Sequence, residues 1–213
     1  MPNLKAIVLD LDGTINDSSP GIIHCFKLTG EHYGIYNIPE ELLRSGLSGP
    51  FTNNLRNILG LKEEQFQEAI KIYTDFYVAG GQWMSQLFPG IKTALETLKS
   101  RGYRLGVATM MVDEYAKETL SKYGILDMFD AVHGASFTIP YNKEDLIEQC
   151  LYSMDVRPDE AVMIGDGIDD YRASRIAGTE FIGVTYGYGL TERVCKENGI
   201  RYADEPGKIT DLI

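Results

Sequence analysis

The sequence predicts an α/β fold, with a Rossmann-like parallel sheet core that carries helices on both faces and an inserted small all-helical domain. Three observations lead to this. Short apolar segments alternate with helical patterns after residue 90, which favours a parallel sheet. The strand-like segments Lys5–Leu11 and Tyr103–Thr109 are separated by residues 12–102, whereas a crossover between parallel strands needs only about a dozen residues. The intervening residues follow helical periodicity. We therefore expect a core formed by residues 1–15 and 87–213, and an inserted domain at residues 16–86.

The inserted segment reads as a series of helices. Ser18 or Ser19 ahead of Pro20 predicts the start of a helix that runs toward Tyr33. A short helix is expected over Pro39–Ser45. A longer amphipathic helix is expected over Lys62–Ala79, because its apolar residues recur at helical spacing. Those residues are Phe66, Ala69, Ile70, Tyr73, Phe76 and Tyr77.

The core elements follow in alternation. Lys5–Leu11 is too short and too apolar for a lone helix and predicts a buried strand. A helix from Ile91 ends before Gly102, and the chain ends in a short helix over Pro206–Ile213. Between these, the pattern predicts strand Tyr103–Thr109, helix Asp113–Tyr123, strand Asp130–Gly134, helix Lys143–Met154, strand Ala161–Gly165, helix Tyr171–Ala177 and strand Phe181–Thr185.

Composition excludes several classes of protein. The 213 residues include 20 Lys and Arg against 31 Asp and Glu, a formal charge of −11, so binding to a nucleic-acid backbone is not expected. No segment is apolar enough for a membrane helix, and Asp10 and Asp12 interrupt the apolar N-terminal run before any signal-peptide pattern. The three cysteines suggest no disulfide framework, which favours a cytoplasmic location. The sequence does not predict the oligomeric state.

Polar side chains stand where the predicted strands end or where the next helix begins. Ligands of open α/β sheets bind at that edge, so we expect these residues to converge. Crowded carboxylates repel one another unless a cation lies between them, and oxygen ligands suit Mg²⁺. One Asp is then available as a nucleophile toward phosphorus, while a hydroxyl and an ammonium bind phosphoryl oxygens. The residues are Asp10, Asp12, Thr109, Lys143, Asp166 and Asp170.

Simpler interpretations exist for each of these residues. Asp12 followed by Gly13 is a common turn pair. Asp166 and Asp170 are also suited to capping the helix that follows them. Lys143 is equally typical of a solvated residue in a first helical turn, and Thr109 of a structural hydroxyl. The joint occurrence of all the motifs favours the functional interpretation.

In order and spacing, four motifs resemble those of the haloacid dehalogenase superfamily along nearly the whole chain. They are Asp10-Leu11-Asp12-Gly13-Thr14, Thr109, Lys143, and Gly165-Asp166 with Asp170. The insertion after the first motif resembles the helical cap of the subfamily that includes phosphoglycolate phosphatases. Met110-Met111 departs from the small polar residues that many relatives carry after the second motif.

The resemblance implies a role for each residue. Asp10 is expected to form an aspartyl-phosphate, and Asp12 to act as general acid and then as general base. Magnesium would be bound by Asp10, by the backbone carbonyl of Asp12 and by Asp166, while Asp170 would hold the metal's waters or orient the lysine. The phosphate would be bound by the backbone N–H groups of Leu11 and Met110 and by the side chains of Thr109 and Lys143.

The implied function is a Mg²⁺-dependent phosphatase for a small phosphorylated metabolite. Two alternatives remain: a phosphosugar mutase of the same superfamily, and a non-catalytic phosphate or Mg²⁺-binding regulator. The dehalogenase branch is disfavoured because Asp12 supplies an acid–base group. The sequence does not distinguish phosphoglycolate, a nucleotide, a sugar phosphate or pyrophosphate as the substrate.

Overall fold

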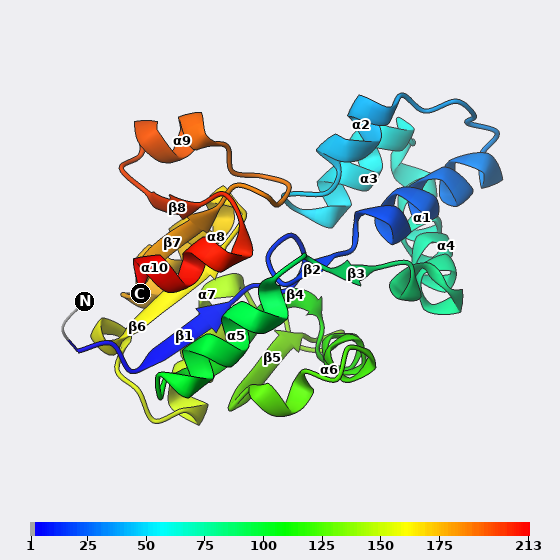
Figure 1. Cartoon of the computed structure of the whole chain (residues 1–213). Helices are drawn as coiled ribbons and strands as arrows, with labels where there is room; N and C mark the ends of the chain where they lie inside the picture. Colours follow the sequence, from blue (N-terminus) through cyan, green and yellow to red (C-terminus); the bar gives the residue numbers. More distant parts are fainter. Residues whose placement is uncertain (1–2) are drawn as a thin grey trace. The chain divides into compact units, whose positions relative to one another are not determined.

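The computed structural model describes residues 3–213 and divides the chain into two compact units (Figure 1). The first unit contains the residues up to Asn16 together with Leu87–Ile213. The second contains Asp17–Gln86. The chain passes between them at two short paired strands, β2 (Asn16–Asp17) and β3 (Gln86–Leu87).

The first unit is built on a six-stranded parallel sheet with the order β5-β4-β1-β6-β7-β8. The predicted α/β core is therefore confirmed. β1 is the blue strand near the middle of the sheet in Figure 1. The strands are β1 (Ala6–Leu9), β4 (Arg104–Val112), β5 (Ala131–Ala135), β6 (Ala161–Gly165), β7 (Glu180–Val184) and β8 (Arg201–Ala203).

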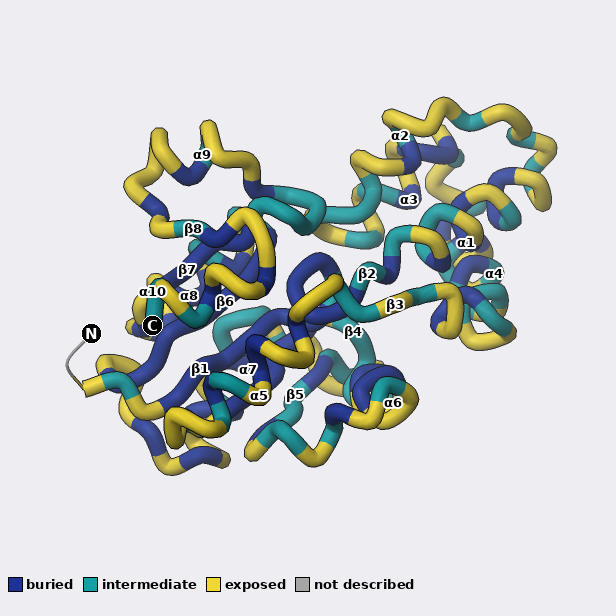
Figure 2. Tube along the Cα trace, viewed as in Figure 1, coloured by how far each residue is buried: buried dark blue, intermediate teal, exposed yellow. Residues whose placement is uncertain are grey.

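Helices cover both faces of this sheet. Side chains alternate along β1, so Ala6 and Val8 belong to one apolar cluster and Ile7 and Leu9 to another. The first cluster includes residues of α7 and α8, and the second includes residues of α5, α6 and α10. Figure 2 shows β1 and β6 buried along their length. The helices are α5 (Ile91–Ser100), α6 (Asp113–Lys122), α7 (Lys143–Ser153), α8 (Ile168–Ala177), α9 (Glu192–Glu197) and α10 (Ile209–Leu212).

The second unit consists of helices around a separate apolar core. Phe26 and Tyr73 pack with their ring centroids 5.1 Å apart, and Leu43 and Leu55 are fully buried beside them. The single helix expected over Lys62–Ala79 is instead a 3₁₀ turn followed by an α-helix. The α-helices are α1 (Ser19–His32), α2 (Glu40–Ser45), α3 (Phe51–Leu59) and α4 (Phe66–Ala79), and the 3₁₀ turns are Glu63–Gln65 and Gly81–Trp83.

Several boundaries differ from those predicted. β4 continues past Thr109 to Val112, and its pairing with β5 shifts in register between these two residues. The strand is longer than predicted because the chain stays extended up to Asp113, whose carboxylate accepts the N–H of Gly134 in β5. α8 begins at Ile168 rather than Tyr171, because its first turn is capped by the carboxylate of Asp170. The sequence pattern did not predict β8, α3 or α9. Among residues 3–213, no helix combines the length and apolar character that a membrane span requires.

Candidate active site

The candidate site lies at the carboxyl ends of three adjacent strands of the first unit. Leu9 pairs with Val107 of β4 on one side and with Ile164 of β6 on the other. Continuing this register places Asp166 and Thr109 level with Leu11, on opposite sides of the chain that leaves β1. The predicted convergence of these strand ends is therefore present in the fold.

Three carboxylates gather at this edge. Asp10, Asp166 and Asp170 each offer one oxygen, and the three oxygens lie within 4.8 Å of one another. The residues are only 8%, 5% and 6% exposed. Because carboxylates buried this closely repel one another, the group requires a positive charge nearby.

Lys143 supplies part of that charge. Its Nζ donates to Asp10 Oδ1 at 2.5 Å and lies 2.8 Å from Asp170 Oδ1. The lysine is the first residue of α7, and its helix is capped by Asp145, whose carboxylate accepts the N–H of Asn142 at 2.8 Å. When all three carboxylates are ionised, the group including Lys143 has a net charge of −2, which one divalent cation would balance.

The crowding of the buried carboxylates also affects their pKa values. Burial, together with Asp170 and Asp166, holds the pKa of Asp10 well above its usual value despite the contact with Lys143. Burial and the neighbouring Asp170 raise the pKa of Asp166 to about 7. Burial by itself lowers the pKa of Lys143, but the carboxylates of Asp10 and Asp170 outweigh it and raise that pKa above its usual value. The ionised forms of Asp10 and Asp166 are thus disfavoured, and a bound cation would favour them.

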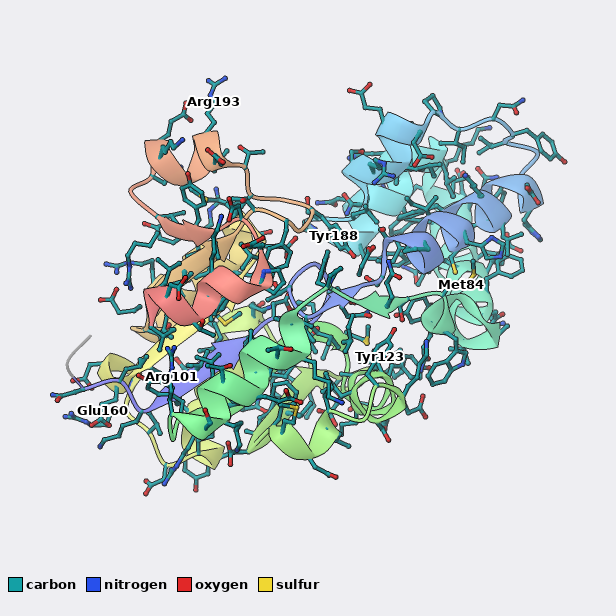
Figure 3. All side chains as sticks on the ribbon, viewed as in Figure 1. Met84, Arg101, Tyr123, Glu160, Tyr188 and Arg193 are labelled. Atoms are coloured by element: carbon teal, nitrogen blue, oxygen red, sulfur yellow. The ribbon has the colours of Figure 1, made fainter. Side chains whose placement is uncertain are left out.

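Close backbone approach fixes the position of Asp166. Its Oδ2 accepts the N–H of Tyr188, labelled in Figure 3, at 2.7 Å. Gly13 adopts a φ of +82°, and a Cβ there would overlap the carboxylate of Asp166. A side chain at Gly187 would overlap Asp166 as well. The site therefore requires glycine at both positions, and the carboxylate can move little.

Asp170 has two functions in this arrangement. One oxygen lies against Lys143, and the other accepts the N–H of Gly167 at 3.0 Å, which caps α8. The expected role in orienting the lysine and the simpler helix-capping interpretation therefore describe the same side chain. Asp169 is exposed and pairs with Arg172 at 3.2 Å, so it lies outside the group.

The carboxylate of Asp12 is placed differently. It is not among the three carboxylates that lie within 4.8 Å of one another, and its Oδ1 accepts the side-chain N–H of Asn16 at 3.1 Å. This separation suits a group that transfers protons rather than one that binds a cation through its side chain. The expected metal contact of Asp12 involves its backbone carbonyl instead.

Three of the residues expected to bind phosphate, Leu11, Thr109 and Met110, lie just after β1 or in β4, and the fourth, Lys143, begins α7. Leu11 buries its side chain in the core, so its side chain is not available to a ligand. Thr109 is buried in β4, and its Oγ1 accepts the N–H of Met111 at 3.1 Å. Met110 is half exposed in the same strand. Their direct contact with phosphate remains a prediction.

Sequence reasoning did not identify two contributors to this site. The N–H of Tyr188 is a backbone donor, and only the glycine-rich stretch around it gave a signal. Asn16 gave none, since its contact with Asp12 depends on how the chain turns between them.

The donor set fits magnesium. All three side chains offer oxygen, which hard divalent cations prefer, and their net charge with Lys143 is −2. Burial and the neighbouring carboxylates raise the pKa values of Asp10 and Asp166, and a bound cation would favour their ionised forms.

Comparisons with known proteins agree with this geometry. The model of the haloacid dehalogenase-like hydrolase family matches residues 7–184. A phosphoglycolate phosphatase from Nitrosococcus oceani is 30% identical over 86% of this chain and 85% of its own length. A haloacid dehalogenase-like hydrolase from Streptococcus pneumoniae is 30% identical, with a TM-score of 0.92 over 100% of this chain and 99% of that one.

Another relative carries a different name. The tyrosine-protein kinase PtkA of Mycobacterium tuberculosis is 33% identical over 90% of this chain. The chain spans 66% of the length of that relative, slightly less than two thirds. The match of the family model over most of the chain, together with the four motifs at one sheet edge, confirms the resemblance seen in the sequence. The chain belongs to the haloacid dehalogenase-like hydrolase family.

Proposed function

We propose that the protein is a Mg²⁺-dependent phosphatase that hydrolyses a small phosphomonoester through an aspartyl-phosphate. The observation that carries this is the buried group of Asp10, Asp166, Asp170 and Lys143, with its net charge of −2. A structural ion-pair network would be expected to balance its own charge. This group instead leaves two negative charges for a divalent cation, at the edge where α/β sheets bind ligands.

Asp10 is the proposed nucleophile. An oxygen of its carboxylate attacks phosphorus, and the bond between phosphorus and the leaving oxygen breaks. Lys143 lies 2.5 Å from Asp10 and holds the side chain in place, while its charge offsets the negative charge of the incoming phosphate. The Leu11 and Met110 N–H groups and the Thr109 hydroxyl are proposed to bind the phosphoryl oxygens.

Asp12 is the proposed acid and base. In the first step its carboxyl proton moves to the leaving oxygen, which departs as an alcohol. In the second step its carboxylate takes a proton from water, the water oxygen attacks phosphorus, and Asp10 leaves as a free carboxylate. Inorganic phosphate is the second product.

Magnesium would be held by Asp10, by Asp166 and by the backbone carbonyl of Asp12. When bound, it would neutralise charge between these carboxylates and the phosphoryl group. Asp170 is proposed to orient Lys143, which it approaches at 2.8 Å.

The names of the relatives suggest phosphoglycolate as the first substrate to test. Purified protein should release phosphate from phosphoglycolate or p-nitrophenyl phosphate with Mg²⁺ and not with a chelator. Asp10→Asn should be folded and inactive. Hydrolysis by Asp10→Asn at the wild-type rate would contradict the nucleophile assignment. The absence of hydrolysis across a broad panel would favour a non-catalytic regulator, and conversion of a hexose 1-phosphate to the 6-phosphate would favour a mutase.

A second candidate is phosphoryl transfer to tyrosine, favoured by the 33% identity to a tyrosine-protein kinase. A carboxylate nucleophile can pass its phosphoryl group to a hydroxyl other than that of water. Incubation with ATP labelled at the γ-phosphate and a tyrosine-containing protein would distinguish the two. Labelled phosphotyrosine supports the kinase, whereas label released only as inorganic phosphate supports the hydrolase.

We further propose that the all-helical second unit is a cap domain that determines substrate specificity. The core of residues 1–15 and 87–213 is then the catalytic domain. The placement of residues 16–86 directly after the first motif supports this. A bound phosphate mimic should slow hydrogen exchange in the helices of the second unit, and unchanged exchange would contradict the proposal.

A further inference from the structure

Asn16 places a buried amide beside the proposed acid–base residue. The residue is 1% exposed, and its Nδ2 donates to Asp12 Oδ1 at 3.1 Å. An ionised carboxylate offers no donor, so the amide must present its N–H₂ end to it. None of the four family motifs includes this asparagine.

The backbone turn explains why the two side chains meet. The carbonyl of Leu11 accepts the N–H groups of Ile15 and Asn16, each at 2.9 Å. The N–H of Gly13 in turn donates to the carbonyl of Asn16 at 2.9 Å, and Asp12 and Asn16 form a β-bridge. Residues four apart in sequence therefore lie side by side at the end of β1, and the backbone fixes the reach of the amide.

The amide oxygen of Asn16, Oδ1, also supports a functional role for this residue. Within residues 3–213, Asn16 Oδ1 is a buried acceptor that receives no hydrogen bond. A buried acceptor without a partner costs folding free energy, and an apolar side chain of similar size would avoid that cost. The useful part of Asn16 is therefore its donor, which faces Asp12.

We infer that Asn16 is a positioning residue for the proposed reaction, whose amide holds the carboxyl group of Asp12 apart from the three clustered carboxylates. The inference rests on the proposed function, because it concerns proton delivery to the leaving group. A neutral amide suits this position because it directs the side chain without adding charge to the group formed by Asp10, Asp166, Asp170 and Lys143. A Lys or Arg at position 16 would change the net charge of −2 that the cation is expected to balance.

The affected step is the first one. Asp10 forms a bond to phosphorus, the bond to the leaving oxygen breaks, and the proton of Asp12 moves to that oxygen. A strongly basic leaving oxygen needs this proton in the transition state, whereas a nitrophenolate departs readily without it. Misplacing Asp12 should therefore slow poor leaving groups more than good ones.

The test compares phenyl phosphate with p-nitrophenyl phosphate, which have similar shapes but leaving oxygens of different basicity. For Asn16→Leu we expect kcat/KM to fall about tenfold on phenyl phosphate, the size of effect that the loss of one hydrogen bond produces, and less than about threefold on p-nitrophenyl phosphate. Asn16→Asp keeps the shape but replaces the donor with an acceptor, and it serves as the second variant if Asn16→Leu does not fold.

Asn198→Leu is the matched control. The Asn198 amide also donates one hydrogen bond, to the carbonyl of Val194 at 2.9 Å, but it lies at the exposed end of α9. This variant should hydrolyse both esters at the wild-type rate. Equal losses on both esters for the Asn16 variants, or no loss, would overturn the inference and leave Asn16 as a stabiliser of the turn. If wild-type protein hydrolyses neither ester and none of the broader panel of phosphomonoesters, the proposed function itself fails.

Discussion

Asp166 provides a quantitative test of the charge imbalance at the site. Without a metal ion, burial and Asp170 raise the pKa of Asp166 from 3.8 to about 7. Between these two pH values the folded state holds a proton that the unfolded state has released, so the free energy of unfolding falls as pH rises. At pH values above 7 the resulting loss of stability is on the order of 4 kcal/mol.

Asp166→Asn should remove this loss. A neutral amide has nearly the same shape, and its oxygen can still accept the N–H of Tyr188. We expect the metal-free variant to be more stable than the metal-free wild type above pH 7, by up to the order of 4 kcal/mol, and equally stable near pH 4. Magnesium should reverse the order, because it stabilises a protein that binds it according to its free concentration and its Kd.

Urea unfolding with a chelator at about pH 4, 6 and 8 measures the effect, and repeating it with Mg²⁺ measures the reversal. Asp169→Asn is the matched control, because Asp169 is exposed and its carboxylate pairs with Arg172, outside the buried group of three carboxylates. It should leave the pH dependence of stability unchanged. If Asp166→Asn is destabilised by the same amount at every pH, the buried carboxylate is not under electrostatic stress and the reasoning is wrong.

Three other changes test separate parts of the structure. Gly13→Ala should lower activity and destabilise the first unit by more than about 1–2 kcal/mol in urea unfolding, because Gly13 has positive φ and abuts Asp166. Phe26→Ala should cost about 3–5 kcal/mol in the second unit, measured by its hydrogen exchange. Hydrogen bonds from Lys5 and Arg157 lower the pKa of Glu160, labelled in Figure 3, to about 2. Glu160→Gln should therefore lower the midpoint of thermal unfolding at neutral pH, where the carboxylate is ionised, and have no effect near pH 2.

The carboxylates of the site could be predicted because strand register determines where they lie. Asp10 and Asp166 each follow a short apolar strand, and parallel neighbours end at the same edge. Lys143 could be predicted as the first residue of a helix, and the resemblance offered its contact with Asp170 as one of two roles for that acid, but the contact with Asp10 was not predicted, because it depends on how α7 packs against the sheet.

Contacts made by the backbone were the part that the sequence did not reveal. Every residue except proline has a backbone N–H. The hydrogen bond from the N–H of Tyr188 to Asp166 therefore does not require a particular residue type at position 188, and the sequence cannot predict it. β8 has three residues and includes the exposed Arg201, which is too little pattern for a strand prediction. The early start of α8 follows from a cap that Asp170 provides from within the helix.

Asp10 and Asp12, the two acids of the first motif, have different hydrogen-bond partners in the structure. Asp10 has a cation beside it and belongs to a group that lacks two positive charges. Asp12 has the neutral amide of Asn16. Lys143 favours the ionised form of Asp10, but burial and the neighbouring carboxylates outweigh it and raise the pKa of Asp10, so a nucleophile that must be ionised is expected to need the metal ion as well. The Asn16 amide directs the Asp12 side chain without placing a formal charge beside it. The two residues of Asp10-Leu11-Asp12 are therefore expected to respond differently to magnesium: its removal should disable Asp10, whereas loss of the Asn16 amide should impair proton delivery even when magnesium is saturating.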